Sequence, residues 1–457
     1  MRASPRTKDC RPLAFTELPR MSWLETTFCG TLRITDEVAG QNGAGITEHS
    51  KRILTMKSSK RYLRFCGIDM AKQKHVACII DQNGRYVLKP KSVRNDADGF
   101  QHLLNCLKQT GRTTSVLVGM EATGHYWYNL HEFLTRHGYA VVVLNPIQTA
   151  QQAKQAIRKC KTDKYDAFHI ANLLRTGQYK PAVVPDELAM TCRQITRLRY
   201  RIVKQGAMIK QLVNSRLHPA WPEYEGLFSN TFGTTSRRLL QTASTPKELM
   251  ELDPDDLSEL IRRTSRGRFG PAQTQKILQS AKNSVGMQRG HYGISTGIKF
   301  LLEQIEALEP VRKKMDAEIA KLAATVPEYL FTLPGATELT IVSLYGEISP
   351  IEAFEKPSQL VAFAGLDPKV FQSGQYDAPR RRISKRGSPY LRRSLWQMAY
   401  RALITEGDLR DFWRRKHRQN KHHLVATTAV ANKLCHVVWR IMTDRRDYIR
   451  KGYNPKS

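Results

Sequence analysis

The sequence is poor in acidic residues, and its cysteines do not occur in pairs. The chain has 457 residues, with 41 Asp and Glu against 73 Lys and Arg, so its formal net charge is +32. Such an excess repels itself in a compact protein, and a polyanion such as nucleic acid offsets that repulsion. The alternative is a basic protein that is kept soluble by its charge. None of the eight cysteines stands in a C-x-x-C pair, which argues against a zinc ribbon or finger.

Long apolar runs are also missing. No stretch approaches the roughly 18 apolar residues that a membrane span needs, and the N-terminus lacks the apolar core of a secretion signal. We therefore expect a cytoplasmic protein without a membrane partner.

A chain of this length predicts two or three domains. Residues 1–58 show no sustained periodicity, and they are either a disordered extension or upstream sequence read through to a natural start at Met56. We expect a nuclease-like α/β domain over 59–185, a central long-helix or coiled-coil region over 186–326, and a mainly α-helical domain over 327–457.

The α/β region is predicted from apolar runs that alternate with helical patterns. The expected order is three strands, a helix, a strand, a helix, a strand and a helix. It begins as an antiparallel meander and continues as a βαβ alternation, which is the order of the RNase H-like (RuvC-like) fold. The expected elements are strands 62–69, 75–81, 86–93, 115–121 and 140–144 and helices 98–108, 128–136 and 163–174.

Two long helical patterns, 189–217 and 297–325, dominate the central region. Apolar residues step by three and four along each, as in a coiled coil, with the first line running through Ile195, Leu198, Ile202, Gln205, Ile209 and Leu212. Pro310 is expected to kink the second helix. The two helices can pair with each other or with a second subunit.

Four carboxylates stand where the predicted elements bring them together. Asp69 ends the first strand and Glu121 the fourth, while Asp163 and Asp166 share one face at the start of a helix. Clustered carboxylates repel one another unless cations lie between them, so we expect two Mg²⁺ (or Mn²⁺) ions, which suit phosphodiester cleavage. Each residue also has a structural interpretation. Asp69 can open a turn, Glu121 can bind a lysine, and Asp163 can cap the helix with Asp166 facing its dipole.

Seven motifs occur in the order of one known family. GIDMAKQKH, MEATGHYW, LNPIQTA and KTDKYDA resemble the RuvC-like domain of insertion-sequence family 110 transposases. LPGATELTIVSLYGEI, FAGLDPKVFQSG and RISKRGSPYLRRSL resemble the C-terminal transposase domain of that family. The resemblance implies recombination of a mobile element on donor and target DNA chosen by a structured guide RNA, often called a bridge RNA. It also carries the catalytic carboxylates over onto Asp69, Glu121, Asp163 and Asp166, and we expect a homo-oligomer, a dimer or a tetramer.

The same resemblance implies a nucleophile at Ser373, in VFQSGQ, which forms a phosphoserine link to DNA. Taken alone, this Ser-Gly pair is typical of a turn. Ser384 and Ser388 are alternative nucleophiles, because both lie in the basic segment 379–393. Basic residues downstream of Ser373 are expected to hold phosphates. They are Arg380, Arg381, Arg382, Lys385, Arg386, Arg392 and Arg393.

Two further segments leave alternatives open. Leu333–Ala336 is either a structural turn or a phosphate-binding hairpin, although Thr337 stands where such hairpins usually have a second glycine. The aromatic and basic run Phe412–Lys416 either contacts nucleic acid or forms a helix with Trp413 in the core.

Overall fold

The computed structural model describes residues 62–122, 124–144, 163–179, 181–182, 184–369, 372–373, 376–377, 382–405 and 407–449. The predicted N-terminal extension and Met56 lie outside these residues, as do Arg380 and Arg381.

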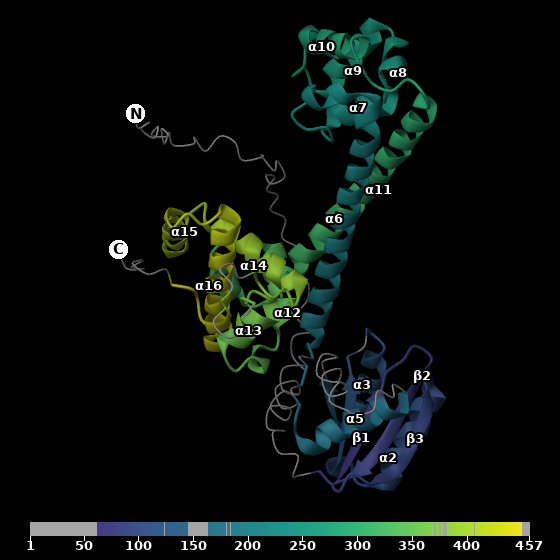
Figure 1. Ribbon diagram of the computed structural model, residues 1–457, viewed down its shortest axis with the longest axis vertical. Coiled ribbons are helices and arrows are strands. Elements are labelled where there is room, and N and C mark those ends of the chain that lie inside the picture. Colours follow the sequence, from purple (N-terminus) through teal and green to yellow (C-terminus); the bar gives the residue numbers. More distant parts are fainter. Residues whose placement is uncertain are drawn as a thin grey trace, which may run out of the picture. The chain divides into compact units, whose positions relative to one another are not determined.

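A mixed five-stranded sheet organises the N-terminal region, in the spatial order β3-β2-β1-β4-β5 (Figure 1). β1 pairs antiparallel with β2 and β2 with β3, whereas β1–β4 and β4–β5 are parallel. This order confirms the predicted meander followed by a βαβ alternation. The strands are β1 Arg64–Asp69, β2 Lys74–Asp81, β3 Tyr86–Arg94, β4 Val116–Glu121 and β5 Ala140–Leu144.

Helices cover both faces of the sheet, because the strands are apolar on both sides. Even-numbered β1 residues such as Cys66 and Ile68 pack with α2 (Ala97–Thr110) and α3 (Trp127–Arg136). Phe65 faces the other way, toward α5 (Asp163–Thr176). The alternation of side chains along a strand thus decides which residues can meet α5.

Two long helices, α6 (Glu187–Ala220) and α11 (His291–Ala323), follow and pack along each other (Figure 1). Their pairing within one chain is the first of the two arrangements that the sequence allowed, and an ion pair of 2.6 Å between Arg199 and Asp316 joins them. The predicted apolar line on α6 is wrong in part, since Leu198 is 50% and Leu212 46% exposed. The buried line lies one position over and runs through Cys192, Thr196, Ile209, Val213 and Leu217. Pro310 lies inside α11, which continues past it.

Short helices between the two long ones form a separate hydrophobic cluster around Trp221 and Tyr224, at one end of the pair (Figure 1). The sequence of this segment had indicated little. Its elements are η3 Pro222–Gly226, α7 Thr234–Thr242, α8 Pro246–Met250, α9 Pro254–Thr264 and α10 Pro271–Lys282.

The C-terminal region is helical, as expected, and its core also takes in the first turns of α6 (Cys192) and the last turns of α11 (Ile319, Ala323). Leu333–Ala336 is a structural turn: a Cβ on Gly335 would lie 2.1 Å from the Met398 carbonyl oxygen, and Thr337 caps α12. The elements are η4 Glu328–Thr332, α12 Glu338–Ile348, η5 Ile351–Ala353, α13 Pro357–Ala364, β6 Gln372–Ser373, β7 Tyr376–Asp377, α14 Pro389–Ala402, α15 Asp408–Arg418 and α16 His423–Asp444.

Candidate active site

Each of the two strand carboxylates follows a glycine by two positions. β1 ends in Gly67-Ile68-Asp69 and β4 ends in Gly119-Met120-Glu121. Ile68 pairs with Met120 across the parallel strands, so Asp69 and Glu121 leave the sheet at the same edge. Residues two apart on a strand share a face, so each carboxylate lies on the face of its glycine.

The two glycines lie directly under α5. A Cβ on Gly67 would be 2.1 Å from the Ala167 carbonyl oxygen and 2.4 Å from the Ala171 amide nitrogen, and one on Gly119 would be 2.7 Å from Leu174 Cδ1. Gly67 and Gly119 are paired across the two strands, so α5 passes closely over both strands at this level.

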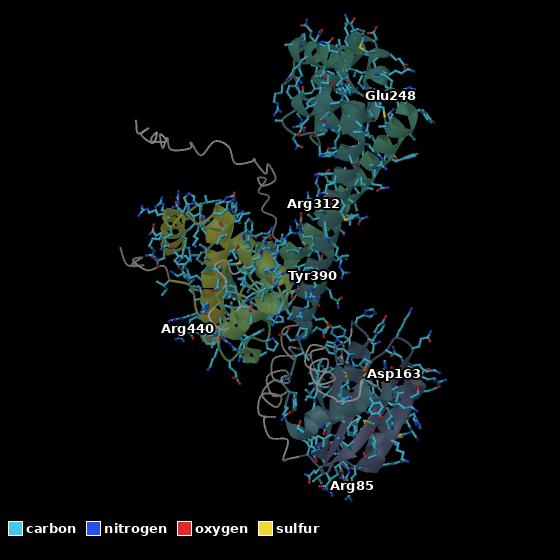
Figure 2. All side chains as sticks on the ribbon, viewed as in Figure 1. Arg85, Asp163, Glu248, Arg312, Tyr390 and Arg440 are labelled. Carbon is cyan, nitrogen blue, oxygen red and sulfur yellow. The ribbon has the colours of Figure 1, made fainter. Side chains whose placement is uncertain are left out.

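That first turn carries the other two carboxylates, Asp163 and Asp166, and Figure 2 labels Asp163 on it. The close approach of the helix over Gly67 brings this turn to the sheet edge where Asp69 and Glu121 end. All four carboxylates thus lie on the α5 face of the sheet.

Electrostatics show the same convergence. The pKa of Asp69 is raised from 3.8 to about 6, first by burial and then by the negative charges of Asp166, Asp163 and Glu121. A backbone hydrogen bond from Met70 opposes this rise. Each of the other three carboxylates is thus close enough to disfavour the charged form of Asp69.

The loop that follows Asp69 is held in place from two sides. His75, which is fully buried, accepts a hydrogen bond on Nδ1 from the Ala71 amide, at 3.3 Å. Asn95 donates from Nδ2 to the Lys72 carbonyl at 3.1 Å. Burial lowers the pKa of His75, which favours its neutral form and keeps the accepting nitrogen available.

The four carboxylates fit a divalent cation by chemistry. They are hard oxygen donors of the kind that Mg²⁺ and Mn²⁺ prefer, and a cation between them relieves the repulsion that raises the Asp69 pKa. In the ranges that the structure describes, no three His, Cys, Asp or Glu side chains are spaced to ligate one ion together. The role of the four as metal ligands stays a prediction.

The second predicted site centres on a hairpin in the C-terminal region. Ser373 on β6 lies opposite Tyr376 on β7. At the base of the hairpin, Ser384 N donates to the Asp367 carbonyl at 2.7 Å and Lys369 N to the Arg382 carbonyl at 2.8 Å.

The two serines that compete with Ser373 are both buried and engaged. Ser384 is 8% exposed and its hydroxyl donates to the Asp367 carboxylate. Ser388 is 9% exposed, donates to Glu347 Oε2 at 2.8 Å, and caps α14 by accepting from the Leu391 amide at 3.2 Å. Neither hydroxyl is available to an external phosphate in this arrangement.

The predicted phosphate-holding residues fall into two groups. Arg382, Lys385 and Arg386 are exposed. Arg392 donates to the Ala364 carbonyl at 2.9 Å and burial lowers its pKa, whereas Arg393 lies 4.5 Å from the centre of the Tyr200 ring. Arg392 and Arg393 are therefore already engaged in contacts within the chain. The nucleic-acid role of the whole set stays a prediction.

Comparison with known sequence families covers both of these regions. Residues 66–222 match a family model described as "Transposase", and residues 327–414 match one described as "Transposase IS116/IS110/IS902 family". Together the two matches cover more than half of the chain.

This chain belongs to the IS110 family of insertion-sequence transposases. Transposases of this kind cut and rejoin DNA.

Individual relatives extend the likeness over nearly their full length. The transposase is 24% identical over 416 residues to the "Transposase for insertion sequence element IS1111A" of Coxiella burnetii, covering 88% of this chain and 97% of that one. It is 23% identical over 391 residues to an "Insertion element IS116 uncharacterized 44.8 kDa protein" of Streptomyces clavuligerus, covering 83% and 94%. A "Pilin gene-inverting protein" of Moraxella bovis is 34% identical over 114 residues, which is 25% of this chain and 34% of that one.

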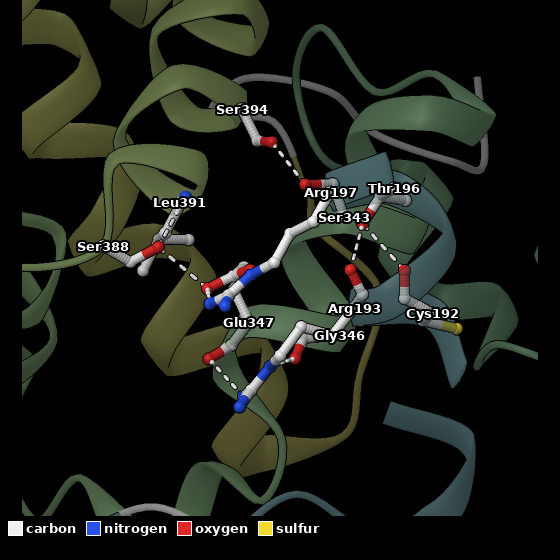
Figure 3. A network of polar contacts seen from close by, with 10 residues as sticks. All are labelled: Cys192, Arg193, Thr196, Arg197, Ser343, Gly346, Glu347, Ser388, Leu391 and Ser394. Atoms are coloured by element: carbon white, nitrogen blue, oxygen red, sulfur yellow. Dashed lines mark hydrogen bonds and ion pairs between the residues drawn. The ribbon is translucent and has the colours of Figure 1, made fainter. Parts of the chain in front are cut away.

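Sequence reasoning missed a buried network that joins α6 to the C-terminal region (Figure 3). Glu347 is fully buried, and Arg197 holds both of its carboxylate oxygens, at 2.6 and 2.9 Å. Arg193 donates to the Gly346 carbonyl at 2.7 Å. Burial by itself lowers the pKa of Arg197, but the hydrogen bond and charge of Glu347 raise it overall.

Ser388, at the end of the loop that carries Lys385 and Arg386, donates a hydrogen bond to the same Glu347 carboxylate and so joins the network. The signal in the sequence was a lone Glu347 in the otherwise apolar run of α12, which is expensive to bury without a partner. Nothing in the local sequence identified Arg197, 150 residues away, as that partner.

Among the described residues, no helix is both long and apolar enough to cross a bilayer.

Proposed function

We propose that the transposase cuts DNA at a metal-dependent site formed by Asp69, Glu121, Asp163 and Asp166, and conserves the broken bond as an ester on Ser373. The observation that carries the proposal is the convergence of the four carboxylates on the α5 face, where burial and then the charges of Asp166, Asp163 and Glu121 raise the pKa of Asp69 to about 6. Structural carboxylates are usually paired with cations, whereas these four oppose one another.

Divalent metal bound by the four carboxylates would supply charge neutralisation at the scissile phosphate and activation of the attacking hydroxyl. The chain's own part is to hold the carboxylates on a rigid sheet edge and helix turn. Gly67 and Gly119 fix the distance of the helix from the sheet, and His75 and Asn95 hold the loop after Asp69. Little rearrangement is then needed at the moment of reaction.

Ser373 is the proposed nucleophile. Its Oγ attacks a DNA phosphorus, forming a P–O bond to serine while the P–O3′ bond breaks, and the serine proton ends on the released 3′ hydroxyl. In rejoining, a 3′ hydroxyl attacks the phosphoserine and the serine recovers its proton. Because the ester conserves the bond energy, strand exchange needs no ATP. The carboxylate site that activates Ser373 belongs to the same or another subunit of a dimer or tetramer.

Support for Ser373 comes partly from its competitors. Ser384 and Ser388 are buried and occupied by Asp367 and Glu347. Ser373 instead lies on the hairpin whose base these contacts fix, ahead of exposed Arg382, Lys385 and Arg386. These cations suit a phosphate held beside the hairpin.

We also propose that a structured RNA encoded by the element selects donor and target DNA. The net charge of +32 suits a protein that binds nucleic acid, and it is compatible with DNA and a guide RNA bound together. RNA that co-purifies from the native host should map to the flanks of the element. It should stay bound at salt concentrations that remove random RNA, and equal loss of both would contradict the guide role.

Two other functions are open to test. A plain nuclease would use the carboxylates with water and leave Ser373 idle, so it would give no protein–DNA adduct. A non-catalytic binding protein would not cleave DNA in Mg²⁺ at all. Loss of cleavage in EDTA together with an adduct in Mg²⁺ excludes both.

The experiment that tests the proposed site uses Asp69→Asn, Glu121→Gln and Asp163→Asn. Each should abolish strand cleavage while nucleic-acid binding persists, because metal ligands are lost and the basic surface remains. Asp98→Asn is the matched control, since Asp98 lies in the same α/β region and pairs at the surface with Arg94. Wild-type cleavage by any of the three variants would show that the four carboxylates do not form the catalytic site.

A further inference from the structure

The last two helices of the transposase form a region almost without negative charge. Between Asp411 and Asp444 the sequence holds no acidic residue, but it holds Arg414, Arg415, Lys416, Arg418, Lys421, Lys433 and Arg440. The two flanking acids are already engaged. Asp411 pairs with Arg414 at 3.5 Å, and Asp444 pairs with Arg440 at 2.8 Å.

Three of these cations gather around one aromatic ring. Arg415 and Lys416, on α15, lie 5.8 and 5.6 Å from the centre of the Phe412 ring. Lys433, on α16, lies 5.1 Å from it. These four residues are called the Phe412 cluster below. None of them takes part in an ion pair within the described part of the chain, and Lys416 hydrogen-bonds only to the neutral Gln419, at 3.4 Å.

The ring attracts each cation, but the three cations repel one another. A bound anion between them would relieve that repulsion. Phe412 and Trp413 pack against the core of the C-terminal region, so their rings serve the fold and are not open platforms for stacked bases. The cluster therefore presents charge held at fixed positions, which suits phosphate contact and does not suit base reading.

We propose that the Phe412 cluster is a binding site for the phosphate backbone of nucleic acid. The site is made of residues outside the predicted phosphate-holding set within residues 380–393, and it depends neither on the four carboxylates nor on Ser373. DNA and RNA share the phosphodiester chemistry that it recognises, and the test distinguishes these two sources.

The test measures affinity against salt concentration for a fluorescent random-sequence DNA duplex and, separately, for a random single-stranded RNA. Lys433→Met keeps an unbranched apolar side chain against the Phe412 ring and removes the charge, and Lys416→Met does the same on α15. Each should lower the slope of log affinity against log salt by about 0.9 on duplex DNA, or by about 0.7 on single-stranded RNA, and the double variant by about twice that. Lys321→Met is the control, because Lys321 is exposed, as Lys433 is, but already pairs with Glu318 at 3.1 Å.

A lower slope on one nucleic acid alone assigns the site to that nucleic acid, and a lower slope on both assigns it to the shared backbone. Slopes that match wild type on both, or that fall no more than in Lys321→Met, overturn the proposal. Because cleavage is not measured, the result stands whether or not the carboxylates and Ser373 act as proposed.

Discussion

Replacing Asp69 by Asn should stabilise the metal-free α/β region at neutral pH. The pKa of Asp69 is raised from 3.8 to about 6 by burial and by Asp166, Asp163 and Glu121. Because the folded state binds this proton more tightly than the unfolded state, the stabilisation is complete below about pH 4 and is lost as the pH rises through about 6. Above that pH, the charged carboxylate weakens the fold.

The size of the effect follows from the same values. At about 1.4 kcal/mol for each pKa unit, a change from 3.8 to about 6 corresponds to about 3 kcal/mol. Solvent screens a half-buried group, so we expect about 1–2 kcal/mol. Asn is neutral and escapes this penalty. The variant should therefore exceed wild type by about that amount at pH 7.5 in EDTA. The difference should shrink as the pH falls through about 6 and should vanish only below the unfolded pKa of 3.8.

Hydrogen exchange resolved to peptides of β1 and α5 is the assay, because a chain with several cores does not unfold in one step. Adding Mg²⁺ should protect these peptides in wild type but far less in Asp69→Asn, since a ligand that binds only the folded state stabilises it. Asp98→Asn, at the surface, should match wild type both in its stability at pH 7.5 and in its protection by Mg²⁺. If wild type and Asp69→Asn exchange alike at pH 7.5 and Mg²⁺ protects neither, the four carboxylates do not act on one another as described.

Three further perturbations test how the structure holds its sites. Gly67→Ala should displace α5, with a packing penalty of about 1–3 kcal/mol. This variant should lose DNA cleavage but keep nucleic-acid binding. Gly206→Ala is the control and should keep both stability and cleavage, because a Cβ there meets nothing within 4 Å. Arg197→Leu leaves the Glu347 carboxylate buried without its cation, so hydrogen exchange in peptides of α6 and α12 should show a loss of about 3–5 kcal/mol. A loss below about 1 kcal/mol would mean that the network contributes little. Ser384→Ala should loosen the hairpin base, slowing strand transfer at saturating DNA while the adduct still forms on Ser373; unchanged transfer would show that the Asp367 contact does not position the hairpin.

The sequence predicted the α/β part well because its signals are local. Short apolar runs and their turn residues specify the strands, and the order of strands and helices limits the topologies. The convergence of the carboxylates also followed, because the ends of neighbouring parallel strands meet at one edge. Gly67 and Gly119, two residues before Asp69 and Glu121, were a missed signal for the close approach of α5, because a glycine within a strand often marks such an approach.

Contacts between distant segments could not be read in the same way. The apolar line on α6 was placed one position off, because the sequence does not say that α12 covers the face of Cys192 and Thr196. The Arg197–Glu347 pair joins residues whose local patterns give no sign of each other. The predicted domain boundaries and the oligomer stay predictions, as does the start at Met56, which lies outside the described residues.

The central claim is that Ser373 takes the broken DNA strand as a covalent ester. The most direct measurement is mass spectrometry of the protein–DNA adduct trapped on nicked DNA in Mg²⁺, after proteolysis and nuclease digestion. The peptide that carries the 5′ phosphate should contain Ser373 as the modified residue, and Ser373→Ala should give neither adduct nor recombinant product while it still binds nucleic acid. Modification of Ser384 or Ser388, or recombination by Ser373→Ala, would contradict the account.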